Sequence, residues 1–414
     1  MPRPLLPLLV IAAALCCAIL TNAACGNMNL RKEVRDLNAS EIAAMQAAFN
    51  QMYSSGRLQT YVNMHVSNNV FAHNSPHFLV WHRVMLVQFE KEFLAAAGGK
   101  LTGLPFWASW MDGGNPGNAP VYGSMLGPKN GCLSGPFKGW TKADGSCVTR
   151  SMQSGAWFNE AITTILSRAT QNSYSDFSTY VEVGAHAATH NGVGGDMASL
   201  LLSPNDVLFW VHHNGVDFLY SQWQAQSDKN MMMYDGSHQG KPVSLDDDVM
   251  GTPARVALDY KANLCYQYAA PGTGGSSASN GGKDASSTSS ASPTATGTTG
   301  GAALPMATLT PEFLKSFNIP EDKLNATMRA ISLAQTFVTQ LQAQNKTLPS
   351  LAQLKTLNLG ALQGMLQNPG ASSDSGNAAG GAGAAAAKSD ATPVSATSLF
   401  PIVVAAAILS LAAM

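Results

Sequence analysis

The stretch FAHNSPHFLVWHR, residues 71–83, holds three of the nine histidines of this 414-residue chain. They are His73, His77 and His82, and His65 lies shortly before them. Imidazole is the side chain that most often holds a transition metal in proteins. From these four histidines the chain can supply a set of three ligands for one metal ion.

A second histidine cluster begins in the sequence VEVGAHAATH, where His186 and His190 are four positions apart. On a helix this spacing stacks two imidazoles on one face, within reach of one metal ion. The pair lacks the glutamate of the His-Glu-X-X-His motif, so a zinc protease site is not predicted.

The stretch SPNDVLFWVHHNGVDFLYSQWQ, which follows, predicts a long helix that is buried on one side. We expect Ser203 or Asn205 near its start and Pro204 in its first turn. The adjacent His212 and His213 differ by ~100° around the helix, so they cannot both point the same way. One of them is expected to complete a second set of three histidines.

Two sets of three histidines in a helical core suit a pair of copper ions. Imidazole is a good copper ligand, and copper heads the affinity order of the divalent first-row metals. Zinc would also accept three histidines and a water, so the spacing alone leaves the metal open.

Both clusters resemble the copper motifs of the type-3 copper proteins, the group of tyrosinase, catechol oxidase (polyphenol oxidase) and haemocyanin. HNSPHFLVWHR with MLVQFEKEF is similar to the first motif, and HAATHNGVGGDM with SPNDVLFWVHHNGVDFLYSQW is similar to the second. The resemblance covers about residues 28–268 and ends in LCYQY. It implies a mainly α fold: an antiparallel four-helix bundle that holds a dicopper centre, with many loops and little sheet.

Carried over residue by residue, the resemblance also implies which histidines bind metal. The ligands of the first copper ion would be His65, His73 and His82, and those of the second His186, His190 and His213. His77 and His212 are then expected in supporting or packing roles beside the ligands.

The implied activity is oxidation of a small phenolic substrate, with dioxygen as co-substrate. Members of the family oxidise o-diphenols to o-quinones, and tyrosinases also hydroxylate monophenols such as tyrosine, whose pKa is about 10. Glu182, four residues before His186, is the candidate base for that proton, or else a carboxylate that stabilises a helix start. The family's assisting Asn would stand at Ala187, but here Asn191 follows the second ligand instead. Diphenol oxidation is therefore the firmer expectation.

Other motif residues have mainly structural interpretations. Phe78 and Leu202 are expected near the mouth of the site, or else packed in the core. Arg83 and Glu90 are expected to form ion pairs at helix ends. Asn205 with Asp206 is expected to cap or orient the last helix.

Composition narrows the other possible functions. The formal net charge is −1 and charged residues make up 12% of the chain, about half the usual share, so no nucleic-acid partner is expected. Two alternatives to an oxidase stay open: a haemocyanin-like protein that binds dioxygen reversibly, and a structural cell-surface protein.

Both ends of the sequence predict an extracellular location. Residues 1–24 have the layout of a cleaved signal peptide, with Arg3 before an apolar run. Residues 399–414 are apolar and follow small residues near Ser389, which favours a glycolipid (GPI) anchor signal over a tail that stays in the membrane. The protein is expected to be secreted, and attached to the cell surface by one of these routes.

Between these ends, composition divides the chain into segments. The dicopper domain is expected at 25–270, followed by a Gly/Ser/Thr-rich linker at 271–304, a small helical module at 305–369 and a low-complexity segment at 370–398.

Four cysteines remain after removal of the signal, which predicts two disulfides among three possible pairings. We favour Cys132 with Cys147 and Cys25 with Cys265. Three Asn-X-Ser/Thr sequons are candidate glycosylation sites: Asn38, Asn325 and Asn345.

Overall fold

The structure, a computed structural model, describes residues 25–272 except the short gaps 154–156, 159–162, 164–166, 168–169 and 171. The predicted signal peptide, the linker beyond residue 272 and everything that follows it lie outside the described residues. Asn325 and Asn345 lie there too. Within the described range, none of the helices combines the length and the apolar character that a membrane crossing needs.

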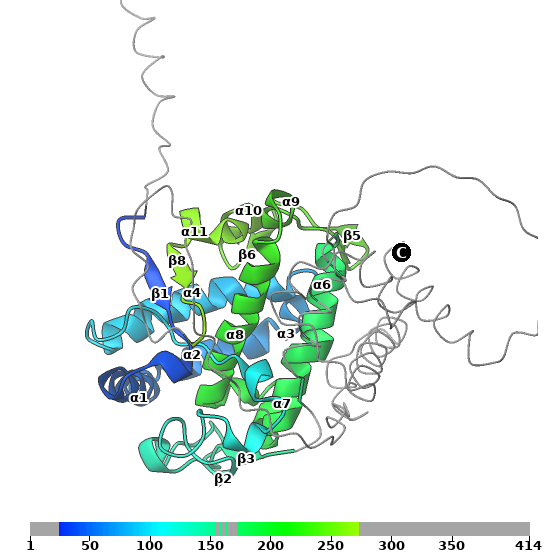
Figure 1. The fold of residues 1–414 in the computed structure, drawn as a ribbon. Coiled ribbons are helices and arrows are strands. Elements are labelled where there is room, and N and C mark those ends of the chain that lie inside the picture. The colour runs from blue at the N-terminus through cyan, green and yellow to red at the C-terminus, as the bar shows by residue number, and fades with distance from the viewer. Residues whose placement is uncertain are drawn as a thin grey trace, which may run out of the picture.

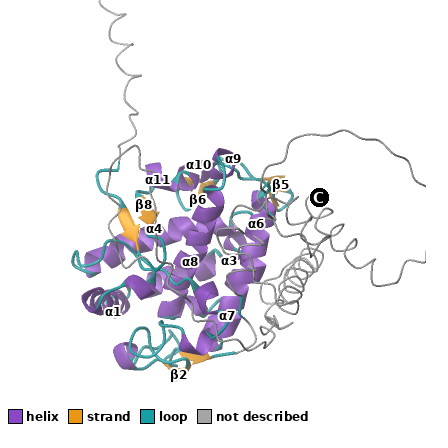
Figure 2. Cartoon of the chain, in the orientation of Figure 1, coloured by secondary structure: helices purple, strands orange, loops and turns teal. Residues whose placement is uncertain are grey.

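Helices make up most of the described domain (Figure 2). They are α1 (Ala39–Ser54), α2 (Arg57–Ser67), α3 (Asn69–Ala72), α4 (Phe78–Ala96), α6 (Tyr174–Tyr180), α7 (Ala187–Val193), α8 (Val207–Gln224), α9 (Asp228–Met231), α10 (Ala254–Leu258) and α11 (Tyr260–Asn263). A π-helical segment, η5 (Val181–His186), joins α6 to α7, and short 3₁₀ turns include η6 (Gly195–Ala198) and η7 (Ser203–Asn205). The mainly α fold that the sequence predicts is confirmed.

The longer helices form a bundle around one apolar core. α4 packs against α1 and against α8, and α8 also contacts η5. Figure 1 shows α8 beside the continuous α6–α7 rod, and these segments carry the second histidine cluster. Because α4, which carries His82 of the first cluster, packs on α8, the two clusters meet inside the bundle. Trp81, Phe209 and Trp210 are fully buried there.

In the part of the chain that the structure describes, sheet is confined to two-stranded pairs. β1 (Asn29–Arg31) pairs in parallel with β8 (Tyr266–Tyr268), which brings the two ends of the domain together. Three antiparallel pairs lie in loops: β2 (Asn130–Cys132) with β3 (Thr149–Ser151), β4 (Ser237–His238) with β5 (Lys241–Pro242), and β6 (Asp248–Val249) with β7 (Thr252–Pro253).

Both predicted disulfides are present. Cys25 bonds to Cys265, next to the β1–β8 pair, and Cys132 bonds to Cys147 across the β2–β3 pair. The first bridge spans 240 positions of sequence and so encloses almost the whole domain. Closing so long a loop restricts the unfolded chain strongly, and such bridges stabilise domains by ~2–5 kcal/mol.

The starts of α1 and α8 are fixed by their capping residues. Asn38 caps α1: its Oδ1 accepts from the amides of Ser40 and Glu41 at 2.9 and 3.0 Å, and Glu41 bonds back to the Asn38 amide. Asn38 is exposed, as its predicted glycosylation requires. Asp206 caps α8, its Oδ1 accepting from the Leu208 amide at 2.8 Å.

The predicted start of α8 was wrong in one detail. Pro204 lies in the separate turn η7, not in the first turn of the helix. The reason is Asp206, whose extended backbone (ψ 135°) interrupts the helical path before the cap forms. Of the residues named for capping, Asp206 makes the bond, whereas Asn205 donates to the Leu202 carbonyl at 2.9 Å.

Arg83 and Glu90 form ion pairs, as the sequence predicted. These pairs lie in the protein interior, however, whereas the prediction placed them at helix ends. The Nε of Arg83 donates to Asp217 of α8 at 2.6 Å, and the guanidinium of Arg31 in β1 donates to the carboxylate of Glu90 at 2.8 Å. Arg31 also donates to Asp217, at 3.1 Å. Burial alone would raise the pKa of Asp217, but the charges of Arg83 and Arg31 hold it below its usual value. The network therefore ties α4, α8 and the first strand together without an unpaired charge.

Candidate metal centre

The first histidine cluster gathers side chains from three consecutive elements. His65 lies in α2, His73 ends α3 and His82 lies one turn into α4. Each offers a ring nitrogen within 4.8 Å of the other two. The ring centroids are 4.9 Å (His65 to His73), 5.0 Å (His73 to His82) and 5.5 Å (His65 to His82) apart.

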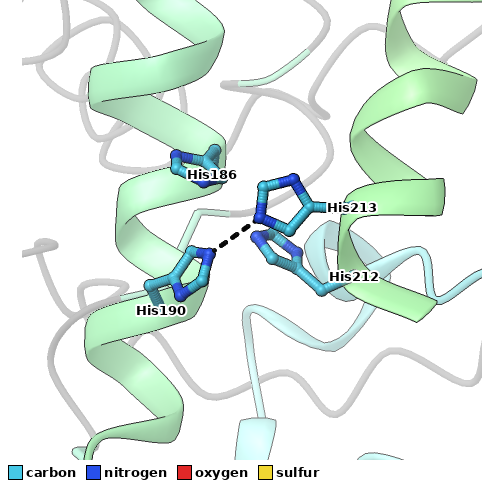
Figure 3. Close-up of side chains that lie close together, drawn as sticks. All are labelled: His186, His190, His212 and His213. Carbon is cyan, nitrogen blue, oxygen red and sulfur yellow. Dashed lines mark hydrogen bonds between the residues drawn. The ribbon is translucent and has the colours of Figure 1, made fainter. Parts of the chain in front are cut away.

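The second cluster has four histidines on two helical segments (Figure 3). His186 ends η5 and His190 lies in α7, while His212 and His213 come from α8. All four offer nitrogens within 4.8 Å of one another, and the Nε2 atoms of His190 and His213 are 3.2 Å apart. The two clusters adjoin, because the rings of His82 and His213 stack at 4.4 Å.

Backbone carbonyls orient four of these imidazoles. The Nδ1 atoms of His73, His82 and His186 lie 2.8–3.1 Å from the carbonyl oxygen of the residue four positions earlier. Nδ1 of His190 lies 2.7 Å from the carbonyl oxygen of Met197. A carbonyl accepts only from N–H, so each Nδ1 carries the proton and each Nε2 presents a lone pair. This is the arrangement that a metal-binding histidine usually has.

Several of the remaining nitrogens are buried without a hydrogen-bond partner. They are Nε2 of His82 and His212, Nδ1 of His213, and both nitrogens of His65. A buried polar atom without a partner costs free energy, and a metal ion that accepts these lone pairs would remove that cost.

Burial also keeps the clustered imidazoles neutral. Loss of water lowers the pKa of each clustered histidine, and for most of them the neighbouring imidazoles lower it further. Burial lowers the pKa of His190 to about 4. Neutral imidazole is the form that binds a metal, so the clusters are in a binding state at pH 7 without first losing protons.

A narrow cavity adjoins both histidine clusters. Five histidines line it together with four other residues, Met197, Leu200, Ser203 and Phe209. The sequence analysis missed Met197, Leu200 and Ser203, because they lie in turns with no helical or strand periodicity.

Comparison with known proteins gives the family. The profile of the common central domain of tyrosinase matches residues 53–226. The tyrosinase of Streptomyces antibioticus is 31% identical over 236 residues, covering 48% of this chain and 84% of that enzyme. The chain belongs to the tyrosinase family of type-3 copper proteins.

Further tyrosinase-family relatives agree with this assignment. Tyrosinase ustQ of Aspergillus flavus is 28% identical over 293 residues, 59% of this chain and 80% of that protein. Hemocyanin 2 of Megathura crenulata is 24% identical over 214 residues, 47% of this chain but 6% of that protein. A polyphenol oxidase structure from Thermothelomyces thermophila shares the fold with a TM-score of 0.50 and 21% identity, over 59% of this chain and 89% of that one.

Within this tyrosinase-family domain, His77 lies outside both clusters. Its ring stacks on Phe71 at 4.0 Å, its Nδ1 is hydrogen-bonded to the hydroxyl of Tyr234, and His238 packs beside it at 5.2 Å. His238 is half-buried. The placement of His77 agrees with the supporting role predicted for it.

His212, for which the sequence predicted only a supporting or packing role, lies within the second cluster. Its ring lies 5.5 Å from that of His186 and 4.9 Å from that of His190, so both members of the His212–His213 pair reach the cluster. The expectation that only one of them faces the site was wrong. The helical angle describes where the Cα–Cβ bonds point, and an imidazole is long enough to turn back from either flank.

Glu182, the candidate base, is buried and makes a structural contact. Its Oε1 accepts the backbone N–H of Asn74 at 2.7 Å. Asn74 has φ 54°, in the left-handed region, and directly follows His73. The carboxylate thus anchors the turn that carries one histidine of the first cluster.

The other predicted pocket residues occupy different places. Asn191 is buried in α7 and donates to the Ala187 carbonyl at 3.2 Å. Phe78 is fully buried, with its ring 4.9 Å from those of both His82 and His186, so it packs between the clusters. Leu202 is 37% exposed and adjoins Ser203, which lines the cavity.

Proposed function

We propose that this protein is a type-3 copper oxidase that uses dioxygen to oxidise o-diphenols to o-quinones. The observation that carries the proposal is the pair of adjoining clusters of neutral, buried imidazoles beside a cavity. His65, His73 and His82 would hold one copper ion, and His186, His190 and His213 the other. Bound copper would supply the redox chemistry between dioxygen and the phenol.

The chain's own residues would prepare the site for that chemistry. The backbone carbonyls hold four imidazoles in one tautomer, so the ligands need little rearrangement when metal binds. Phe78 and Phe209 pack against the rings and exclude water from the cluster side of the cavity. A phenol would enter from the side of Leu200 and Ser203.

Reversible dioxygen binding is the second candidate, since haemocyanins are among the relatives. An oxidase is favoured because the tyrosinase of Streptomyces antibioticus is more similar in sequence to this chain, at 31% identity, than the haemocyanin is, at 24%. An oxidase also needs an opening for a phenol, and the exposed Leu202 lies at the edge of the cavity.

The test is copper content together with catechol oxidation, measured on the full-length protein. We expect about two copper ions per chain and turnover of 4-methylcatechol to its o-quinone. Binding of two copper ions and of dioxygen without turnover would select the carrier. Failure to bind copper would leave the structural cell-surface protein.

We also propose that the protein acts outside the cell. Two disulfides support this location, because such bonds persist in oxidising compartments. Attachment through a glycolipid anchor near Ser389 is testable by release from cells with a phosphatidylinositol-specific phospholipase. Retention on the membrane after this treatment would favour the tail anchor instead.

A further inference from the structure

Two of the segments that border the cavity contain no formally charged residue. Residues 58–82 carry the first histidine cluster, and residues 197–205 contribute Met197, Leu200 and Ser203 to the cavity lining. Neither segment contains an Asp, Glu, Lys or Arg. The turn η7, within the second segment, packs on α2, within the first.

The charges that flank these segments are already paired with other side chains. Arg57 pairs with Glu92 at 2.5 Å and Arg83 with Asp217 at 2.6 Å, on either side of the first segment. On either side of the second, Asp196 pairs with Lys142 at 2.7 Å, and Asp206 with Arg150 at 2.6 Å.

Glu182 lies four residues before His186, and it too is engaged elsewhere. Its carboxylate accepts the Asn74 amide, and it does not line the cavity. Among the described residues of these two segments, a charged substituent of a phenol would therefore meet no charged partner, and it would lose part of its hydration on entry.

Exposed aliphatic side chains are concentrated on the same two segments. Among the described residues, seven large hydrophobic side chains are exposed, and four of them are Val66, Val70, Leu201 and Leu202. Val70 is the most exposed, at 72%. Leu201 and Leu202 directly follow Leu200, which lines the cavity, and exposed aliphatic side chains next to a binding site are typical of a surface that contacts an apolar ligand.

We propose that the site selects small, uncharged phenols with an apolar substituent, and discriminates against phenols whose substituent carries a charge. The hydroxylated ring would enter the cavity, and the substituent would cover Leu201 and Leu202 at its edge. This inference rests on the proposed function, because it concerns the substrate of the same oxidase.

Turnover of a graded series of catechols by the full-length, copper-loaded protein is the first test. The series is 4-tert-butylcatechol and 4-methylcatechol (neutral), dopamine (cationic), dihydroxyphenylalanine (zwitterionic) and 3,4-dihydroxyphenylpropionate (anionic). We expect kcat/KM to be at least about tenfold higher for 4-tert-butylcatechol than for any charged member, mainly through KM, since burying one methylene is worth ~0.8 kcal/mol, or about fourfold. Equal values for neutral and charged catechols would overturn the inference and leave the oxidase intact, whereas no turnover of any catechol would count against both.

A binding measurement gives a readout that does not depend on turnover. The dissociation constant of 4-butylphenol is measured by calorimetry for the wild type and for the double variant Leu201→Ser and Leu202→Ser. We expect the double variant to bind 4-butylphenol several-fold more weakly. Leu245→Ser is the matched control, because Leu245 is as exposed as Leu202, at 37%, but lies in the loop between β5 and β6 and has no sequence neighbour in the cavity lining. Unchanged binding in the double variant, or equal weakening in the control, would overturn the inference.

Discussion

The two histidine clusters lie side by side but are built differently. The first takes one histidine from each of α2, the end of α3 and α4, and His73 sits where a short helix gives way to a turn. The second takes all its histidines from two helical segments and has four of them within reach of one another. The first cluster therefore depends on contacts that position a turn, whereas the second has one imidazole more than a three-ligand site requires.

Loss of a histidine from the first cluster is expected to have the largest effect. His82→Ala leaves two imidazoles there, so we expect about one copper ion per chain and a loss of catechol oxidation of roughly 100-fold or more. Metal analysis and kcat/KM for 4-methylcatechol measure both quantities. His77→Ala is the control from the same stretch, and it is expected to keep both copper ions. Loss of copper from the control would mean that His77 belongs to the site.

Substitutions of Glu182 separate its two possible roles. Glu182→Ala removes the acceptor of the Asn74 amide and frees the turn of His73, so we expect copper affinity at the first cluster to fall about 10- to 100-fold. Glu182→Gln keeps an oxygen acceptor, so copper binding and catechol oxidation are expected to persist. Monophenol hydroxylation should be lost in Glu182→Gln only if the carboxylate also accepts the phenol proton.

The control for this experiment is a carboxylate on the surface. Glu92→Ala removes the partner of Arg57 and should leave copper binding unchanged. If Glu182→Ala bound copper as tightly as this control does, the anchoring role would be refuted.

The extra imidazole of the second cluster predicts a milder response there. His213→Ala leaves His186, His190 and His212 in place, so we expect it to retain close to two copper ions per chain, with oxidation reduced by less than in His82→Ala. The double variant His212→Ala and His213→Ala leaves two imidazoles and should lose one copper ion. A single His213→Ala variant with only one copper ion would show that His212 cannot replace its neighbour.

The features that the sequence predicted involve residues close together in the chain, whereas those it did not predict involve residues far apart. His73, His82, His186 and His190 could be found because each pair lies close together in sequence, within a recognisable motif. The disulfides could be paired because Cys132 and Cys147 lie 15 positions apart around one loop, which leaves Cys25 for Cys265 at the other end of the domain. The partners of Arg83 and Glu90 could not be found, because Asp217 and Arg31 come from distant parts of the chain.

Side-chain reach and irregular turns account for the other differences. A helical wheel separates His212 from His213 but ignores how far an imidazole bends from its Cβ, so the fourth histidine was missed. Met197 and Leu200 follow no periodic pattern, and only the folded chain shows that they face the cavity. The lack of charge in residues 58–82 and 197–205 was a signal in the sequence, but its meaning depends on their meeting at one opening.

The smallest expected effect is a pH dependence of the free energy of unfolding, to which both the clustered histidines and His77 contribute. Burial lowers the pKa of His190 and of His77 to about 4, below the ~6.5 of an unfolded chain. The unfolded state therefore binds more protons than the folded state between pH ~6.5 and about 4, so the free energy of unfolding of the metal-free protein should fall as the pH drops through this range.

Each such histidine contributes a slope of up to ~1.4 kcal/mol per pH unit in that range. Urea unfolding of the metal-free protein between pH 7 and pH 5 measures the sum of these slopes. His77→Gln should reduce the slope by about one histidine's share, and copper should flatten it further because bound metal keeps the clustered histidines unprotonated. The opposite outcome would be a slope that copper leaves unchanged and that His77→Gln abolishes. The pH dependence of the free energy of unfolding would then come from His77, and protonation of the clustered imidazoles would not be what destabilises the fold in acid.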